Sequence, residues 1–211
     1  NPDRTSLIEA IKTAKNKFDI SYVIEDSEEA VRDAIDGVSR IEVIVKSLKE
    51  FSRPDDKQAI PYNIGNCIET ALSVSANKIK NKAKVHVELE EVPDILGQPG
   101  SMTQVFVNLL VNAGDAIEGY GEIWVSLSME GNFIKAVVKD SGAGIKPNDL
   151  LKVFDPFFST KEIGQGTGLG LSISQGIVNS HGGKIDIFSE PGKGAEFSIT
   201  LPIERDKTRQ T

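Results

Sequence analysis

The spacing of apolar residues predicts two long helices at the start of the chain. Between residues 27 and 52 apolar side chains recur in steps of three and four, as in a coiled-coil seam, at Val31, Ala34, Val38, Ile41, Val45 and Leu48. Residues 7–18 repeat this spacing. A hairpin this thin cannot bury both apolar stripes, so the pattern favours a homodimeric four-helix bundle. A helix pair packed against its own chain is the alternative.

From residue 60 the pattern changes to short helices and strands. The stretch SRPDDKQAIPYN predicts a linker, which places a hairpin at residues 1–53, a linker at 54–61 and a second domain at 62–211. Neighbouring strands in that domain are joined by short turns, which rules out a purely parallel sheet. We therefore expect an α+β chain whose second domain is an α/β sandwich, with helices on one face of a mixed sheet. The expected helices are 64–80, 102–119 and 169–181, and the expected strands are 84–90, 122–128, 133–140, 183–190 and 195–202.

Composition limits the classes of binding partner and the cellular compartments that we expect for the protein. A net charge of -7 and a pI near 5.0 leave no basic face, so we do not expect nucleic acid as a partner. Cys67 is the only cysteine, which excludes an internal disulfide and favours a reducing, cytoplasmic compartment. The chain has no apolar run long enough for a membrane span and begins at Asn1. We expect a soluble piece of a longer protein whose other parts could carry a membrane anchor.

Two groups of polar residues are candidates for ligand binding. Asn108, Asn112 and Asp115 share one face of the helix at 102–119, opposite its apolar side, although such side chains could also be merely solvated. Asp140 ends a strand and can accept a hydrogen bond from an exocyclic amine, while Gly142 and Gly144 leave room for a flat ring. Asp-Ser-Gly is also an ordinary turn sequence.

A glycine-rich stretch precedes the last helix. Its glycines alternate with other residues and leave backbone N–H groups open, and the N-terminus of the following helix favours phosphate. The spacing matches neither the dinucleotide fingerprint G-x-G-x-x-G nor the phosphate loop that ends in Lys-Ser/Thr. The two commonest nucleotide-binding folds are therefore disfavoured.

Four motifs carry a family resemblance. NLLVNAGDA, DSGAGI, VFDPFFSTK and GQGTGLGLSI, in this order within residues 104–173, closely resemble the asparagine box, the first glycine box, the phenylalanine box and the second glycine box of sensor histidine kinases. These kinases share a superfamily with gyrase, heat-shock chaperones and mismatch-repair ATPases. The resemblance reaches the C-terminus through HGGKIDIFSEPGKGAEFSITLP, and reaches back to about residue 27 through the paired helices.

The resemblance implies a site for ATP and Mg²⁺. Asn112 would bind the metal, Asp140 would accept from the adenine amino group, and residues 155–167 would form a mobile lid anchored by Phe154, Phe157 and Phe158. Lys161 would reach the γ-phosphate, unless it is simply solvated. The expected catalytic residues are Asn108, Asn112 and Lys161. The expected nucleotide-binding residues are Asn108, Asn112, Asp140, Gly142, Gly144, Ile145, Phe154, Phe158, Lys161, Gly164, Gly166, Thr167, Gly168, Leu169 and Gly170.

The resemblance also indicates what receives the phosphoryl group. In the ATP-hydrolysing relatives a glutamate four residues before the metal-binding asparagine activates water. Asn108 occupies that place here, and an amide cannot accept a proton as a carboxylate does. The acceptor in the kinases is a histidine in the motif His-Glu-x-x-Asn-Pro. Asn1 and Pro2 would be the tail of that motif, and a second helix ending LKEFSRP matches the nitrogen-regulation subtype.

The implied function is a homodimeric kinase that phosphorylates a histidine just upstream of this chain, for relay to an aspartate of a response regulator. The alternatives are an ATPase that drives conformational change, a serine kinase of the anti-sigma-factor type and a non-catalytic dimeric scaffold. Two positions depart from the family: Gln98 stands where relatives often have an aspartate, and Asp115 stands where many relatives have a basic residue thought to touch phosphate. The second departure puts a phosphate role for Asp115 in doubt, and we do not assign one.

Overall fold

Two compact units make up the chain, residues 1–48 and 49–211. In the first unit, helix α1 spans Arg4–Lys17 and begins after Asp3, whose Oδ1 accepts hydrogen bonds from the backbone N–H groups of Thr5 and Ser6 at 2.6 and 3.0 Å. Such a cap satisfies donors that the first turn of a helix leaves unpaired.

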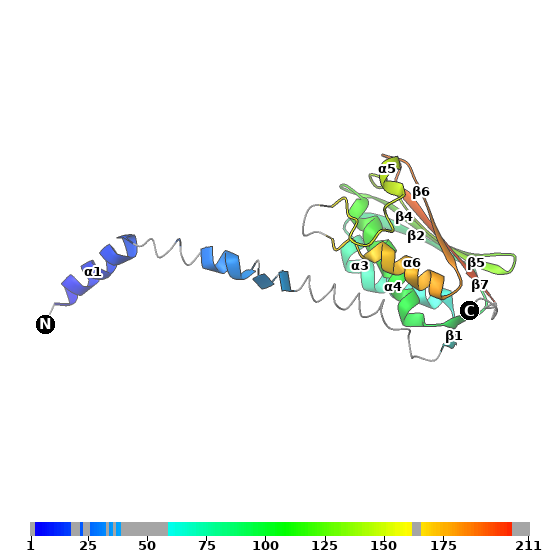
Figure 1. Ribbon diagram of the computed structural model, residues 1–211, viewed down its shortest axis with the longest axis horizontal. Helices are drawn as coiled ribbons and strands as arrows, with labels where there is room; N and C mark the ends of the chain where they lie inside the picture. Colours follow the sequence, from blue (N-terminus) through cyan, green and yellow to red (C-terminus); the bar gives the residue numbers. More distant parts are fainter. Residues whose placement is uncertain are drawn as a thin grey trace. The chain divides into compact units, whose positions relative to one another are not determined.

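The computed structural model (Figure 1) describes residues 3–17, 22, 26–32, 34–35, 37–38, 59–161 and 166–203.

The predicted second helix of the hairpin is described only up to Val38, and it is helical wherever it is described. Three apolar residues of the predicted seam, Leu7, Val31 and Val38, are 50%, 58% and 65% exposed in the single chain. The remainder of that helix, and residues 1 and 2 of the expected histidine motif, lie outside the described residues. Helix pairing and the dimer therefore stay predictions.

The second unit contains a five-stranded sheet with the strand order β2-β4-β5-β7-β6 (Figure 1). Strand β2 runs parallel to β4, whereas the other neighbours are antiparallel, which confirms the predicted mixed sheet. The strands are β2 (Ala83–Leu89), β4 (Gly121–Glu130), β5 (Phe133–Asp140), β6 (Lys184–Ser189) and β7 (Ala195–Pro202).

A separate pair of short strands escaped the sequence analysis. β1 (Ile60–Tyr62) and β3 (Ile95–Gly97) form a two-stranded antiparallel sheet. Each has three residues, too few to display the alternation by which a strand is recognised in a sequence. β1 begins within the range expected as a linker.

Three helices cover one face of the large sheet: α3 (Ile64–Ile79), α4 (Pro99–Ala116) and α6 (Gly170–Ser180); a fourth helix, α5 (Pro147–Leu150), is short (Figure 1). Along β4 the inward-facing Val125 and Leu127 are buried, whereas Ser126 between them is half-buried. This alternation is typical of a sheet covered on one face, and it confirms the predicted α/β sandwich. None of the described helices is long and apolar enough to cross a membrane.

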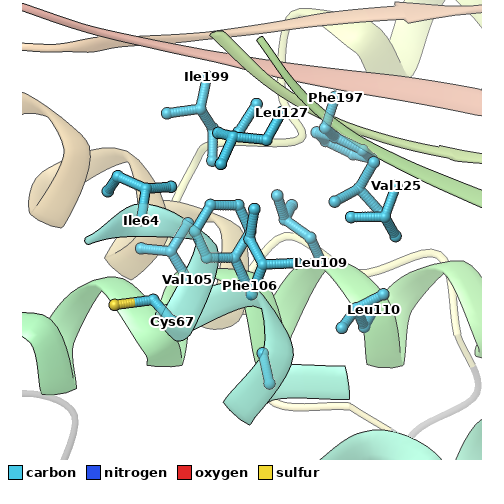
Figure 2. Close-up of a cluster of buried hydrophobic side chains, with 14 of the residues drawn as sticks. Ile64, Cys67, Val105, Phe106, Leu109, Leu110, Val125, Leu127, Phe197 and Ile199 are labelled. Atoms are coloured by element: carbon cyan, nitrogen blue, oxygen red, sulfur yellow. The ribbon is translucent and has the colours of Figure 1, made fainter. Parts of the chain in front are cut away.

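The core fixes the orientation of α4. Phe106 and Leu109 lie between this helix and sheet residues such as Leu127 (Figure 2), and Phe106 is fully buried. Truncating a buried phenylalanine to alanine typically costs about 3–5 kcal/mol. The buried side of α4 repeats at helical spacing, at Met102, Val105, Phe106, Leu109, Leu110 and Ala113. The opposite side of the helix is therefore left for polar residues.

Candidate functional site

Asp140 is a buried carboxylate at the end of β5. Its side chain is 3% exposed, and Oδ1 accepts hydrogen bonds from the backbone N–H groups of Gly142 and Ala195, at 2.8 and 3.3 Å. Burial raises the pKa of this carboxyl group, and the two hydrogen bonds oppose that rise. Oδ2 accepts no hydrogen bond from any described residue, so one oxygen is fixed and the other can serve a ligand.

The loop after Asp140 is held by contacts within the protein. Ala143 donates its N–H to the carbonyl of Ala116 at 2.9 Å, and Gly192 donates to the carbonyl of Ala143 at 2.7 Å. A Cβ atom on Gly142 would collide with the carbonyl of Ala116, and one on Gly144, where φ is 68°, would collide with the carbonyl of Glu190. These two glycines are therefore required by close approach of the backbone and, at Gly144, by a positive φ value.

An open hollow of about 340 Å³ lies beside this loop. It is lined by Glu118, Ser141, Gly142, Ala143 and Gly192. Ile145, another expected site residue, is half-buried against the core, and its N–H donates to Ser189 Oγ at 2.9 Å. The hollow adjoins the turn that directly follows the strand-end carboxylate, and Asp140 itself is not among its lining residues.

The polar side of α4 carries two asparagines in different roles. Asn108 donates from Nδ2 to the carbonyl of Gly170 at 3.1 Å and to Ser174 Oγ at 3.3 Å, which ties α4 to the first turn of α6. Ser174 is fully buried, and the sequence analysis did not identify it. Asn112 lies one turn further along and is half-buried, and its amide makes no hydrogen bond with a described residue. It remains available to a ligand.

Helix α6 begins with unpaired donors. Its N-cap residue, Leu169, supplies no side-chain hydrogen bond, so the N–H groups of the first turn can face an anion. Thr167 lies just before this point and accepts the N–H of Leu169 at Oγ1, at 3.4 Å. Of the glycines in the predicted phosphate-binding stretch, Gly166 and Gly168 precede α6 and Gly170 is its first residue. Gly164 lies outside the described residues.

Backbone contacts join the two ends of the predicted lid. Phe157 donates its N–H to the carbonyl of Gly168 at 3.0 Å, and a Cβ atom on Gly168 would collide with the backbone of Phe157. Phe154 packs against the core and Phe158 is half-buried, whereas Phe157 is 60% exposed with φ at 68°. Such a φ value is uncommon for a residue other than glycine. Within the second unit, Phe154 and Phe158 fit the anchoring role, and Phe157 does not.

Lys161 lies against the C-terminal turn of α4. Its Nζ is 2.7 Å from Oδ2 of Asp115, and Nζ of Lys82 is 4.0 Å from the other carboxylate oxygen. Asp115 was left unassigned in the sequence analysis because it departs from the family pattern, and its partner Lys161 is 46 residues away along the chain. The structure thus brings together the polar side of α4, the start of α6 and Lys161, with Asp140 beside the end of α4.

Known proteins are similar to this chain in sequence. The profile of the histidine kinase-, DNA gyrase B-, and HSP90-like ATPases matches residues 97–205. Sensor histidine kinase ZraS of Escherichia coli (strain K12) is 34% identical over 167 residues, which cover 78% of this chain and 35% of that protein. Sporulation kinase E of Bacillus subtilis (strain 168) is 32% identical over 176 residues, which cover 80% and 23%. The chain therefore spans less than half of either relative.

Solved structures of histidine kinases are similar to this chain in fold. The catalytic domain of histidine kinase ThkA superposes with a TM-score of 0.62 at 29% identity, covering 70% of this chain and 97% of that one. Histidine kinase ThkA in complex with the response regulator protein TrrA gives a TM-score of 0.67 at 28% identity, covering 81% and 49%. The chain therefore belongs to the histidine kinase-, DNA gyrase B-, and HSP90-like ATPase family, and the members that it resembles are sensor histidine kinases.

Proposed function

We propose that the chain is the kinase portion of a sensor histidine kinase, which binds Mg-ATP and transfers the γ-phosphoryl group to a histidine. The observation that carries this proposal is the state of Asp140. A buried carboxylate with one oxygen held by two backbone N–H groups and the other without a hydrogen bond from any described residue is an acceptor prepared for an amino group. Adenine presents such a group, and guanine has a carbonyl oxygen there.

At the other end of the candidate site, around the N-terminus of α6, the residues fit a triphosphate with Mg²⁺. The N-terminus of α6 offers uncapped N–H groups, and Lys161 supplies a positive charge. Asn112 has an unused amide oxygen, and Mg²⁺ commonly takes one or two protein oxygens and fills its other positions with phosphate and water. No group of three His, Cys, Asp or Glu residues that could hold a metal occurs in the described ranges. Bound Mg²⁺ would offset phosphate charge during transfer.

The choice of transfer over hydrolysis rests on Asn108. Its Nδ2 is already engaged with α6, and its amide oxygen is a poor proton acceptor, so it cannot activate water as a glutamate would. Phosphoryl transfer needs positioning and charge neutralisation more than covalent chemistry from the protein. The remaining requirement is a nucleophile, which we place on a histidine upstream of residue 1.

The names of the relatives support the rest of the proposal. They are sensor histidine kinases, and one solved structure contains a response regulator. We propose that the phosphoryl group passes to a receiver-domain aspartate, that residues 1–53 form the dimer hairpin and residues 54–61 the linker, and that this part of the protein is cytoplasmic. Exposed Leu7, Val31 and Val38 are suited to a second copy. The nitrogen-regulation-like subtype also stays a prediction.

Phosphoryl transfer is tested with the protein extended upstream to include its histidine. ATP labelled at the γ-phosphate is added with Mg²⁺, and the product is tested in acid and in base. Label that is lost in acid and retained in base, and that moves to a receiver domain, is the expected result. Rapid release of phosphate to water would identify an ATPase, and an acid-stable label on the protein would identify a serine kinase. The absence of both products would favour a non-catalytic scaffold. An upstream His→Gln variant is the control.

A further inference from the structure

The ion pair between Lys161 and Asp115 links two segments that are distant in sequence. The distance between Nζ and Oδ2 is 2.7 Å, and the side chains are 32% and 36% exposed. Lys82 approaches the other oxygen of the same carboxylate, at 4.0 Å. Asp115 therefore has a lysine near each oxygen, and Lys161 is the closer of the two.

The position of the pair relates it to the proposed phosphate end. Asp115 follows Asn112 by three residues on the polar side of α4. The stem of Lys161 lies beside the glycine stretch, because a Cβ atom on Gly166 would be 3.4 Å from its Cδ. Lys161 thus touches the glycine stretch with its stem and the last turn of α4 with its charge.

We propose that Asp115 is a positioning residue that holds Lys161 until the terminal phosphate of the nucleotide takes its place. This inference rests on the proposed function. An ammonium group has a positive charge and three donors, which can satisfy a carboxylate or a phosphate. Because an ion pair at this exposure changes an equilibrium by a factor of no more than about five, the pair orients Lys161 without preventing the exchange.

The exchange has a consequence for nucleotide preference. ATP must displace the Asp115 carboxylate to gain Lys161, whereas ADP lacks the terminal phosphate and gains little from Lys161. Asp115 therefore lowers the affinity for ATP more than the affinity for ADP. Simple repulsion between Asp115 and the phosphates is the competing explanation, and it does not require Lys161.

The first test uses no nucleotide. Trypsin must capture the Lys161 side chain in order to cleave after it, so Asp115 should protect this bond. Asp115→Asn is expected to speed cleavage after Lys161 by about two- to fivefold, the factor that corresponds to such a pair. Glu118→Gln removes an exposed charge near the same end of α4 and should leave the rate unchanged. An unchanged rate in Asp115→Asn would overturn the positioning role.

The second test is a double-mutant cycle of Asp115→Asn and Lys161→Gln, with dissociation constants measured for Mg-ATP and Mg-ADP. Asp115→Asn should tighten ATP binding by about two- to fivefold when Lys161 is present. It should give no gain in the Lys161→Gln background and a smaller gain for ADP. Equal gains in both backgrounds would show plain repulsion and overturn the inference. Failure of the unaltered protein to bind ATP would instead refute the proposed function, while the trypsin result would still report on the pair.

Discussion

The two ends of the candidate site are built in different ways. At one end, Asp140 is 3% exposed and its Oδ1 is fixed by two backbone donors. At the other, Lys161 and Asp115 are each about one third exposed and are joined by a single ion pair. One end is held by backbone geometry and the other by side chains that can change partners.

The physical cause lies in the surrounding backbone. Gly144 and Gly194 adopt φ values of 68° and 80°, and their Cα atoms lie so close to neighbouring carbonyl groups that no side chain fits. Lysine, in contrast, has a long stem and a charge that stays in partial contact with water. We infer that recognition of the base is prepared by the fold, whereas the phosphate end adjusts to its ligand.

The largest predicted effect is on the rigid end. In Gly194→Ala the new Cβ atom would collide with the carbonyl of Asp140 at a φ value of 80°. We expect a loss of about 2–5 kcal/mol in the free energy of unfolding, from the collision and the unfavourable φ together. Gly192→Ala is a matched control, because φ is 77° there and no atom lies within 4 Å. It should lose only about 1–2 kcal/mol. Equal losses in urea denaturation would contradict a close-packed loop.

The next effect concerns the ligand oxygen of Asp140. Asp140→Asn can keep the two hydrogen bonds to Oδ1, but it replaces Oδ2 by an NH₂ donor that faces the adenine amino group. We expect affinities for ATP and ADP to fall alike, by about 10- to 100-fold, because a hydrogen bond to a charged group is worth about 1.5–3 kcal/mol. Calorimetry measures both affinities. A loss of affinity for ATP but not for ADP would indicate that Asp140 contacts the phosphates and not the base.

A smaller effect separates the two asparagines of α4. Asn112→Ala should weaken Mg-ATP binding about tenfold and change the free energy of unfolding by no more than about 0.5 kcal/mol, since its amide makes no hydrogen bond with a described residue. Asn108→Ala removes two hydrogen bonds to α6 and should cost about 1–3 kcal/mol of stability. Denaturation and nucleotide titration of both variants measure the two effects. A larger loss of stability in Asn112→Ala than in Asn108→Ala would contradict these roles.

The smallest effect is the dependence on pH. Burial raises the pKa of Asp140, so its ionised form is less favourable in the folded state than in the unfolded state. Its contribution to stability is present below the unfolded pKa and is lost as pH rises through the folded pKa. Asp140→Asn should therefore gain stability over the unaltered protein at neutral pH, and this gain should shrink on acidification. Denaturation curves across pH measure it, and a gain that grows at low pH would contradict the assigned sign.

Elements with a long periodic pattern were predicted well from the sequence. The expected helix at 102–119 is α4, Pro99–Ala116, and the expected strand at 133–140 is β5 with the same bounds. β1 and β3 were missed because three residues give no pattern. Periodicity identifies which face of an element is buried, and short elements stabilised by their partner lack that signal.

The chemistry of the site was only partly visible in the sequence. His181 follows the last residue of α6, a position where a positive charge would suit the helix dipole. In the structure it is buried and its Nε2 accepts the N–H of Gln98 at 3.1 Å, so that nitrogen carries no proton. Its Nδ1 lies 2.8 Å from the carbonyl of Ile177 and is the donor. A local rule about helix ends cannot foresee a partner 83 residues away, and the same limit concealed the partner of Lys161.

The most direct test of the central claim is a calorimetric titration of the unaltered chain with Mg-ATP and, separately, with Mg-GTP. The account predicts saturable binding of one ATP per chain. It predicts that GTP binds at least about tenfold more weakly, because guanine turns a carbonyl oxygen toward the carboxylate of Asp140. No binding of ATP, or equal binding of both nucleotides, would contradict the assignment of Asp140 as the residue that selects the base.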